Sequence, residues 1–197
     1  MNTRHKLLSR DYFNRPTLIV ARSLLGKYLV RFIDGREIAG KIIEVEAYVG
    51  HRDKACHASK GKTQRTEVMF GPGGLAYVYL IYGMYHCLNV VTEREAFPAA
   101  VLIRAIEFDG VLIDGPGRLC RALQIDRTLN RIDLTTQASL WFEDRGGRIF
   151  RRQIAALPRI GVDYAGEWAK KLWRFRLQTV LSAKSRSRSA RSRTSDQ

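Results

Sequence analysis

The sequence predicts a single domain of the α+β class. The chain has 197 residues, of which 45% are hydrophobic, and this is enough for one substantial core but short for two. Its main apolar runs alternate with the period of β-strands and are separated by turns, whereas two shorter segments have a helical pattern. We expect the folded domain at residues 1–181 and a Ser/Arg-rich tail with the composition of a disordered segment at 182–197.

The first predicted elements are a helix and a β-hairpin. Pro16 to Leu25 has proline near its first position, apolar residues on one side and Gly26 as its stop. Lys27 to Ile33 and Arg36 to Val49 are predicted strands, and the Asp-Gly pair at 34–35 between them favours a tight hairpin turn. The helix therefore serves as scaffold, and the hairpin delivers the residues considered next.

The second strand of this hairpin places two carboxylates and a phenol on one face. With a period of two, Glu44, Glu46 and Tyr48 alternate with apolar residues. A rigid strand can hold a general base in fixed geometry beside an aromatic surface. The alternative is a half-buried strand that shows its polar side to water. The apolar face, expected in the core, consists of Ile43, Val45, Ala47 and Val49.

Residues 50–74 are predicted to form an irregular basic loop. Glycines interrupt any regular period there, and the basic side chains include Arg65. Loops often carry functional residues, so His57 in this loop is a candidate site residue. A single loop histidine is more often an ordinary surface residue, and the basic side chains are either phosphate contacts or solubilising charge.

Ala76 to Thr92 is rich in tyrosine and is predicted to form two strands with a sharp turn near Gly83. This places Tyr82 and Tyr85 beside the turn, while Tyr79 points elsewhere. An aromatic side chain at a tight tip can act as a wedge in DNA, and others can stack on bases. The alternative is that tyrosine simply favours strands.

Ala100 to Glu107 is a further predicted strand, on which Arg104 shares a face with Leu102 and Ile106. An arginine among apolar neighbours requires a partner, and Glu46 is an available carboxylate. A purely structural salt bridge would give the same pattern.

The tripeptide at 115–117, Gly-Pro-Gly, is predicted to open an apolar helix from Leu119 to Ile125. Its first amides could hold a phosphate. The same tripeptide occurs in helix–hairpin–helix modules, but alone it is a weak signal and we favour a plain helix start. Residues 126–177 contain three tryptophans and are expected to pack against the rest and close the domain.

The charge of the chain favours a polyanionic partner. The net charge is +15, and because the tail holds five basic residues and one acid, the body alone carries +11. Nucleic acid is the partner that such an excess favours.

Three cysteines without a C-x-x-C spacing argue for a reduced chain with no structural metal site. The sequence shows neither a signal peptide nor an apolar run of transmembrane length, so we expect a soluble protein with no membrane contact.

Together these motifs resemble those of the alkyladenine (3-methyladenine) DNA glycosylase family. The resemblance covers about residues 8–178. It implies a curved antiparallel sheet that carries the active site, with flanking helices, in a monomer that needs no cofactor. The matching motifs, in order, are Ala21-Arg22-Ser23-Leu24-Leu25-Gly26, Glu44-Val45-Glu46-Ala47-Tyr48, Tyr77 to Tyr85, Leu102-Ile103-Arg104-Ala105, Gly115-Pro116-Gly117-Arg118-Leu119-Cys120 and Arg159 to Trp168.

By this resemblance, Glu46 is the general base that activates water, and Arg104 positions Glu46 and the water. The implied reaction is hydrolysis of an N-glycosidic bond in double-stranded DNA. Its substrates would be alkylated or deaminated purines of the class of 3-methyladenine, 7-methylguanine, hypoxanthine and ethenoadenine. An alkylated purine is already a cationic leaving group and needs no general acid, whereas the sequence identifies no proton donor for a neutral base. The product would be an abasic site without a strand nick.

The resemblance also assigns the binding residues. Tyr48, His57 and Tyr79 would line the pocket for the extruded base, and Asn89 would exclude the exocyclic amine of normal guanine. Tyr82 would fill the gap left in the stack. Further DNA contacts are expected from Tyr85, Arg65 and Thr63.

Two departures from the family pattern occur. Thr63-Gln64-Arg65-Thr66 stands where the family usually has Thr-Pro-Arg-Asn, which bears on the rigidity of the loop and on lesion preference. Leu172 stands where a proline is common, which concerns packing.

Three other functions compete with this assignment. A non-catalytic nucleic-acid-binding protein would use the basic, tyrosine-rich surface and the tail but would not require Glu46 with Arg104. A bifunctional glycosylase with lyase activity would need an activated amine. A helix–hairpin–helix glycosylase has only residues 115–117 in its favour. We expect the protein to be located with the DNA. In a bacterium this is the nucleoid in the cytoplasm, and in a eukaryote it is the nucleus.

Overall fold

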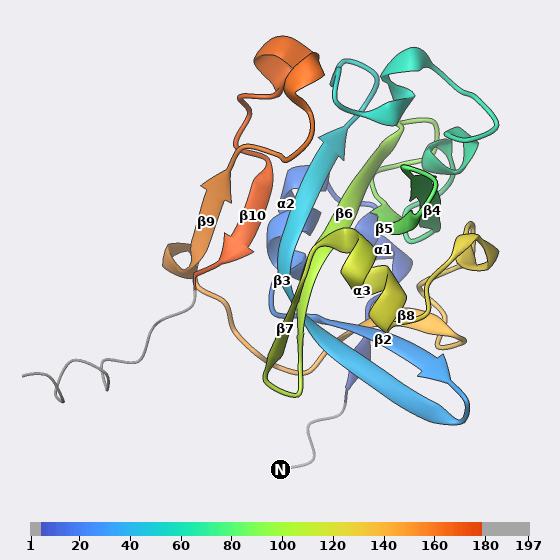
Figure 1. Ribbon diagram of the computed structural model, residues 1–197, viewed down its shortest axis with the longest axis vertical. Helices are drawn as coiled ribbons and strands as arrows, with labels where there is room; N and C mark the ends of the chain where they lie inside the picture. Colours follow the sequence, from blue (N-terminus) through green and yellow to red (C-terminus); the bar gives the residue numbers. More distant parts are fainter. Residues whose placement is uncertain (1–4, 179–197) are drawn as a thin grey trace, which may run out of the picture.

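A computed structural model describes residues 5–178 of the chain. They form one body of the α+β class built on an antiparallel sheet, as predicted, and this sheet has ten strands. Figure 1 shows β3 and β6 side by side through the centre of the molecule. The strands run in the order β1-β8-β2-β3-β6-β5-β4, while β10 pairs with β3 and β9, and β7 pairs with β6. Their bounds are β1 Lys6–Leu7, β2 Tyr28–Ile33, β3 Arg36–Val49, β4 Ala76–Ile81, β5 Tyr85–Val91, β6 Ala99–Phe108, β7 Val111–Asp114, β8 Leu140–Asp144, β9 Ile154–Leu157 and β10 Arg174–Leu177.

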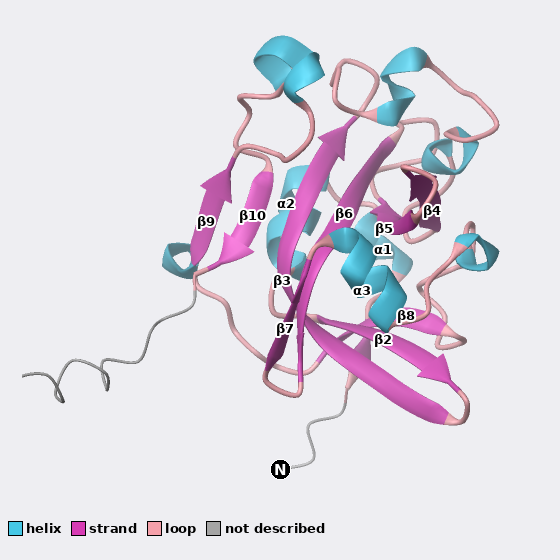
Figure 2. Cartoon of the chain, in the orientation of Figure 1, coloured by secondary structure: helices cyan, strands magenta, loops and turns pink. Residues whose placement is uncertain are grey.

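Helices are few and lie around the sheet (Figure 2). The predicted first helix is α2, Thr17–Leu24, and Pro16 is its N-cap rather than its first residue. The helix predicted at 119–125 is α3, which begins earlier, at Pro116, and ends at Ala122. It begins there because proline occupies its first turn, where no backbone amide is needed. The remaining helical segments are α1 Arg10–Phe13, η1 His57–Lys60, η2 Glu67–Phe70, η3 Arg127–Leu129, η4 Arg151–Gln153 and η5 Asp163–Trp168.

Both predicted hairpins are confirmed. Asp34 and Gly35 have φ angles of 50° and 76° in the turn between β2 and β3, which is the left-handed pair that a two-residue hairpin loop requires. Tyr82 and Gly83, with φ angles of 53° and 68°, form the turn between β4 and β5. The tyrosine-rich segment is therefore a hairpin whose tip carries Tyr82.

Two β-bulges interrupt the pairing of β3 with β6 and correct the predicted alternation. Ile43 is an extra residue on β3, and Arg104 is an extra residue on β6. Ile42 therefore joins Val45 and Ala47 in the main core cluster, while Ile43 is buried as predicted but lies outside this cluster. The prediction that Ile106 shares a face with Arg104 was wrong, because the bulge turns Ile106 into the core.

The main core lies between the sheet and the helices α1, α2 and α3. Its largest fully buried side chains include Phe13, Leu24, Phe142 and Phe175. A second, smaller cluster joins the loop 50–74 to β4, β5 and β6 and includes Met69. This loop is therefore anchored by apolar contacts, although the sequence predicted it only as an irregular segment.

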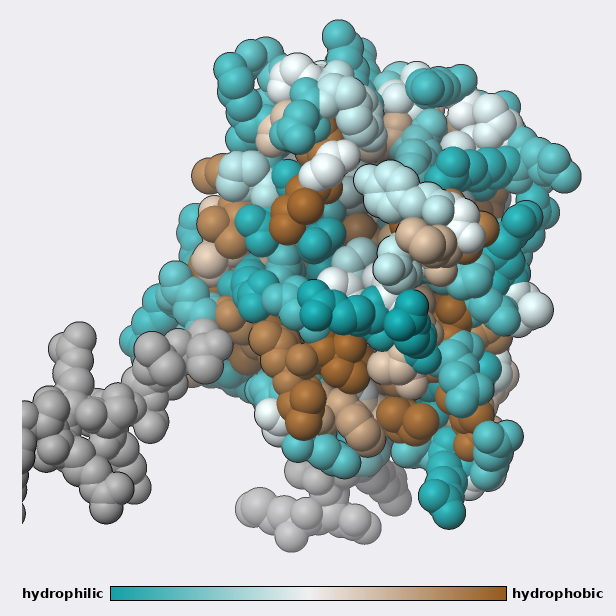
Figure 3. All heavy atoms as spheres, viewed as in Figure 1, coloured by the Kyte–Doolittle hydropathy of each residue, from teal (hydrophilic) through white to brown (hydrophobic). Residues whose placement is uncertain are grey.

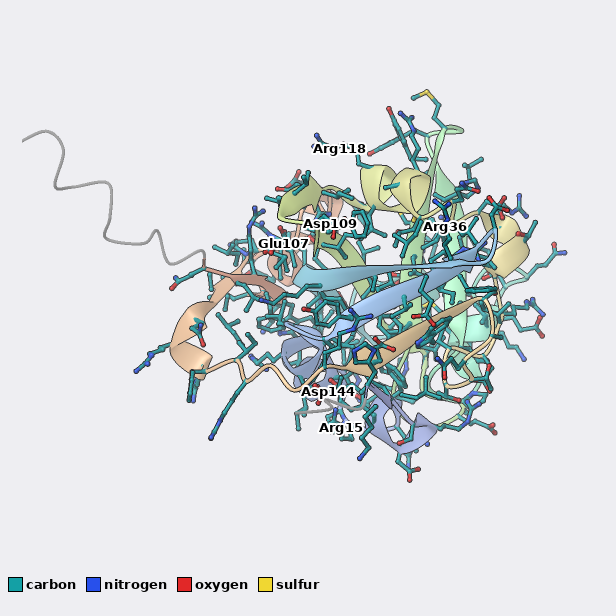
Figure 4. All side chains as sticks on the ribbon, turned by 90° about the horizontal axis from the view of Figure 1, so that it is seen from below. Arg15, Arg36, Glu107, Asp109, Arg118 and Asp144 are labelled. Carbon is teal, nitrogen blue, oxygen red and sulfur yellow. The ribbon has the colours of Figure 1, made fainter. Side chains whose placement is uncertain are left out.

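The surface is largely hydrophilic (Figure 3), and the charged residues Arg36, Glu107 and Arg118, labelled in Figure 4, are exposed. Below the centre of Figure 3 an apolar area overlies the region of β2 and β7. The exposed apolar residues of these strands are Phe32, Val111 and Leu112.

Between residues 5 and 178 no helix is long and apolar enough to cross a membrane. The same residues contain no cluster of three or more His, Cys, Asp or Glu side chains suited to a metal ion. The predicted tail and its boundary at residue 181 lie outside the described residues.

Candidate active site

A cavity of about 820 Å³ opens on the polar face of β3. Its walls come from β3, β4, β5 and β6, from the loop 50–74, from the start of α3 and from residues 160–164. Thr63 is the predicted site residue that is absent from this lining. The predicted residues that line the cavity are Glu46, Tyr48, His57, Arg65, Tyr79, Tyr82, Tyr85, Asn89 and Arg104.

Glu46 is held at the base of this cavity with its side chain fully buried. The backbone amide of Ile160 donates a 2.9 Å hydrogen bond to its Oε1, and Nε of Arg104 lies 3.6 Å from the same oxygen. Its Oε2 accepts a 2.7 Å hydrogen bond from the hydroxyl of Tyr48. The two oxygens of the carboxylate are therefore distinct, because one faces the protein scaffold and the other faces a pocket wall.

Burial raises the pKa of Glu46 above the ordinary value for a glutamate carboxyl. Arg104 opposes this rise, as do the amide of Ile160 and the hydroxyl of Tyr48. Arg104 therefore favours the ionised carboxylate, as expected from the sequence, but desolvation is the larger effect. A raised pKa is typical of a carboxyl group that works as a general base in a closed site.

Arg104 has a second partner, Glu44, at a shorter distance than Glu46. Its Nε lies 3.3 Å from Oε1 of Glu44, which is buried to the same degree. Arg174 and Arg176 of β10 also bind Glu44, at 3.0 and 2.6 Å. The sequence indicates that Glu44 lies beside Glu46 but does not reveal these two arginines, because only the pairing of β10 with β3 brings them there.

The walls of the cavity are aromatic. The rings of His57 and Tyr79 meet edge to face with their centroids 4.7 Å apart. Nδ1 of His57 lies 2.9 Å from the hydroxyl of Tyr77, a residue of the matching motif to which the sequence gave no separate role. Burial, together with Arg65 and Lys60, lowers the pKa of His57 to about 4. The imidazole is therefore neutral at pH 7, with one ring nitrogen a hydrogen-bond donor and the other an acceptor.

A buried ion pair that the sequence did not reveal lies behind Tyr48. The two terminal nitrogens of the Arg159 guanidinium, Nη1 and Nη2, bind the carboxylate of Asp53 at 2.5 and 2.9 Å, and both side chains are fully buried. Arg159 also donates to the backbone oxygens of Ala47 and Trp168, and its guanidinium lies 4.9 Å from the ring centroid of Tyr48. The pair therefore ties three separate segments together beneath one wall of the cavity. Arg159 belongs to a matching motif, whereas Asp53 carried no signal.

The rim of the cavity carries the hairpin tip. The side chain of Tyr82 is 81% exposed at a left-handed backbone position, while Tyr85 packs on the start of α3. A Cβ atom at Gly117 would lie within 2.9 Å of the ring of Tyr85, so this contact explains the second glycine of the Gly-Pro-Gly tripeptide. Deeper in the cavity, Asn89 is fixed by a 3.1 Å hydrogen bond from its amide to the backbone oxygen of Tyr77.

The loop that departs from the family pattern is ordered by threonines. The hydroxyl of Thr66 donates to the backbone oxygen of Gly61 at 3.0 Å and accepts from the amide of Thr63 at 2.9 Å. The amide of Thr66 in turn donates to the hydroxyl of Thr63 at 3.2 Å. These bonds hold Arg65 with its guanidinium 4.8 Å from the ring centroid of Tyr79. Hydrogen bonds of the two threonines therefore hold this loop without the usual proline and asparagine.

The chain is similar to known proteins along most of its length. Residues 11–180 match the family model described as methylpurine-DNA glycosylase. The chain is 52% identical over 185 residues to a protein of Methanocella arvoryzae, with 86% of this chain and 91% of the relative covered. It is 53% identical over 171 residues to a protein of Legionella pneumophila strain Corby, covering 85% and 92% of the two chains. A Myxococcus xanthus protein is 51% identical over 172 residues, covering 85% and 88%. All three carry the name "Putative 3-methyladenine DNA glycosylase".

Proposed function

The chain belongs to the methylpurine-DNA glycosylase family, and from this premise we propose that its aromatic cavity receives a damaged purine flipped out of duplex DNA. The protein is a DNA glycosylase, a hydrolase of N-glycosyl bonds that acts on alkylated purines in base excision repair. The observation that carries the site assignment is the burial of Glu46 at the base of this cavity, with Arg104 beside it.

Glu46 is the general base in this proposal. A water between Glu46 and the flipped nucleotide attacks C1′ while the base departs, through a transition state with oxocarbenium character. The water gives its proton to Oε2, because Oε1 already accepts the amide of Ile160 and faces Arg104. A lesion such as 3-methyladenine or 7-methylguanine leaves without a general acid, since alkylation has already made it cationic. Hypoxanthine and ethenoadenine complete the proposed substrate class.

The cavity walls supply the binding energy for the flipped base. Tyr48, His57 and Tyr79 offer aromatic surfaces on which a purine can stack, and stacking offsets the cost of extraction from the duplex. The neutral imidazole of His57 can hydrogen-bond the base. The amide of Asn89, which is buried and held by the backbone oxygen of Tyr77, would obstruct the exocyclic amine of normal guanine.

The hairpin tip and the basic rim contact the duplex in this proposal. Tyr82 projects into solvent in the protein alone and would occupy the gap that the flipped nucleotide leaves. Arg65 and Tyr85, which line the cavity, and Thr63, which does not, would contact the DNA around the lesion. The protein would act as a monomer, because one chain contains every residue that the proposed reaction uses.

The reaction is proposed to be monofunctional. Cleavage of the strand by a lyase step needs an activated amine that forms a Schiff base. Among the residues that line the cavity in the described part of the chain, none is a lysine. The product would therefore be an intact strand with an abasic site.

The test uses a duplex oligonucleotide with one hypoxanthine or one 3-methyladenine, incubated with the wild type or with Glu46→Gln and then divided between alkaline and neutral treatment. We expect the wild type to give alkali-dependent cleavage and Glu46→Gln to bind the duplex without releasing the base. Glu143→Gln is the matched control, because Glu143 is also a buried carboxylate but lies on β8 and bonds Trp141 and Arg145.

Each other outcome has a defined meaning. Cleavage without alkali would reveal a lyase activity and contradict the monofunctional reaction. Binding without base release from any lesion, by the wild type as well, would favour a non-catalytic nucleic-acid-binding role.

A further inference from the structure

Glu44 is the most heavily bound carboxylate near the cavity, and the proposed reaction assigns it no role. Its side chain is 1% exposed. Oε1 faces Nε of Arg104 at 3.3 Å and Nη1 of Arg174 at 3.0 Å, and Oε2 faces Nη1 of Arg176 at 2.6 Å. Arg176 also reaches Asp114 at 3.0 Å, at the edge of the group. Both oxygens of Glu44 are therefore occupied by protein donors, so this residue is not available to substrate or water.

The first connection from Glu44 to the general base runs through Arg104. Nε of Arg104 lies between the two carboxylates, 3.3 Å from Glu44 and 3.6 Å from Glu46. The bulge on β6 makes this possible, because it adds Arg104 to the strand without a pairing partner on β3. Glu44 therefore fixes the side chain that faces Oε1 of Glu46.

The second connection runs through Arg174 and the backbone. While Nη1 of Arg174 binds Glu44, its Nε donates a 2.7 Å hydrogen bond to the backbone oxygen of Pro158. Two residues later the amide of Ile160 donates to Oε1 of Glu46 at 2.9 Å. Glu44 therefore also anchors the segment that supplies the backbone donor to the base.

We propose that Glu44 is a positioning residue, which holds Oε1 of Glu46 through Arg104 and Arg174 and thereby keeps Oε2 directed at the reacting water. The proposal rests on the role of Glu46 given above. Both connections end on Oε1, so neither competes with the proton transfer at Oε2. Geometric control of this kind matters because a misplacement of about 1 Å in a catalytic group can cost about 100-fold in rate.

The experiment measures the single-turnover rate of base release and, separately, the affinity for lesion-containing duplex. Glu44→Gln keeps the shape of the side chain but removes the charge that binds three arginines. We expect the rate to fall on the order of 10- to 100-fold, while duplex affinity changes less than about twofold, because Glu44 does not face the cavity. In a background of Arg104→Gln with Arg174→Gln, the same substitution should cost less than about threefold, because both connections are already broken.

Controls separate positioning from stability. Glu143→Gln removes an equally buried carboxylate with its own arginine partner on β8, and it should leave the rate unchanged at a temperature where it is folded. If Glu44→Gln does not fold, Arg176→Met replaces it, because Arg176 is partly exposed and binds Glu44 without contacting Glu46. This variant should lower the rate to a smaller extent.

The outcomes are distinguishable. An unchanged rate in folded Glu44→Gln, or an equal loss in the double-arginine background, would overturn the positioning role while the activity of the wild type still supports the proposed function. If the wild type itself releases no base from any lesion, the proposed function fails first, and Glu44 then has no base to position.

Discussion

The hydroxyl of Tyr48 donates a 2.7 Å hydrogen bond to Oε2 of Glu46, the same oxygen that we assign to proton transfer. This bond stabilises the ionised carboxylate and lowers its pKa, whereas burial, the larger effect, raises it. Because the base must be ionised, excision should fall as the pH drops through a Glu46 pKa that lies above the ordinary glutamate value of about 4.3.

Tyr48→Phe should move this acidic limb of the rate profile to higher pH, because the substitution removes a bond that favours the ionised form. The measurement is the single-turnover rate as a function of pH for both proteins. Tyr79→Phe is the matched control, since it removes another tyrosine hydroxyl of the cavity lining, one that makes no hydrogen bond to Glu46. An acidic limb in the same place for Tyr48→Phe and the wild type would show that the bond does not set the pKa.

His57 should make the fold sensitive to mild acid. Its folded-state pKa of about 4 is below the ordinary histidine value, so the unfolded chain takes up the proton first as the pH falls. Its contribution to stability is complete above about pH 6.5 and decreases by at most about 1.4 kcal/mol per pH unit until the pH reaches the folded pKa.

Urea denaturation at several pH values tests this expectation. His57→Gln should flatten the loss of stability between pH 6.5 and 4 relative to the wild type. His51→Gln, at an exposed position in the same loop, should leave the wild-type dependence unchanged. Parallel curves for the wild type and His57→Gln would contradict the prediction.

Arg159→Met should destabilise the protein strongly. It leaves the carboxylate of Asp53 buried without its guanidinium, and breaking a buried pair in this way costs roughly 3–5 kcal/mol. The free energy of unfolding in urea measures the effect. Lys170→Met is the comparison, because it breaks the exposed pair with Glu167, and such pairs contribute at most about 1 kcal/mol. Equal losses in the two variants would refute the argument.

Tyr82→Ala should impair extraction of the base without affecting the fold. The side chain is mostly exposed, so the free energy of unfolding should change by less than about 0.5 kcal/mol. Excision from a fully paired duplex should slow by roughly tenfold or more, whereas excision of the same lesion from a single strand should slow far less, because no stack needs to be filled there. Phe32→Ala, another exposed aromatic but on β2, should slow neither reaction. Equal slowing on both substrates would assign Tyr82 a different role.

The strands and their turns could be predicted because local chemistry determines them. The bounds of β3 coincide with the predicted Arg36 to Val49, and the Asp-Gly and Tyr-Gly turns lie where expected. The bulges could not be predicted. The sequence pattern in β3 is compatible with either Ile42 or Ile43 in the main core cluster, and only the pairing with β6 decides between them.

The same limit applies to the cavity. Of the ten site residues predicted from the resemblance, nine line the cavity, because the family motifs include the residues of the site. The resemblance did not reveal Arg174 and Arg176 around Glu44, nor Asp53 as the partner of Arg159. These contacts join segments more than 100 residues apart, and no local pattern of charge or hydrophobicity records such a distance.

The two bulges have a consequence for how sequences of this fold can change in length. Because one extra residue on β3 is matched by one on β6, the register on either side of the pair is the same. A deletion of Ile43 alone would shift one half of the strand against its neighbour and turn either the carboxylates or the core residues to the wrong face. Single-residue insertions and deletions are therefore excluded from the middle of both strands, whereas the exposed turns at 34–35 and 109–110 can accept them. Related sequences that keep this fold must therefore either retain both bulges or lose both of them together.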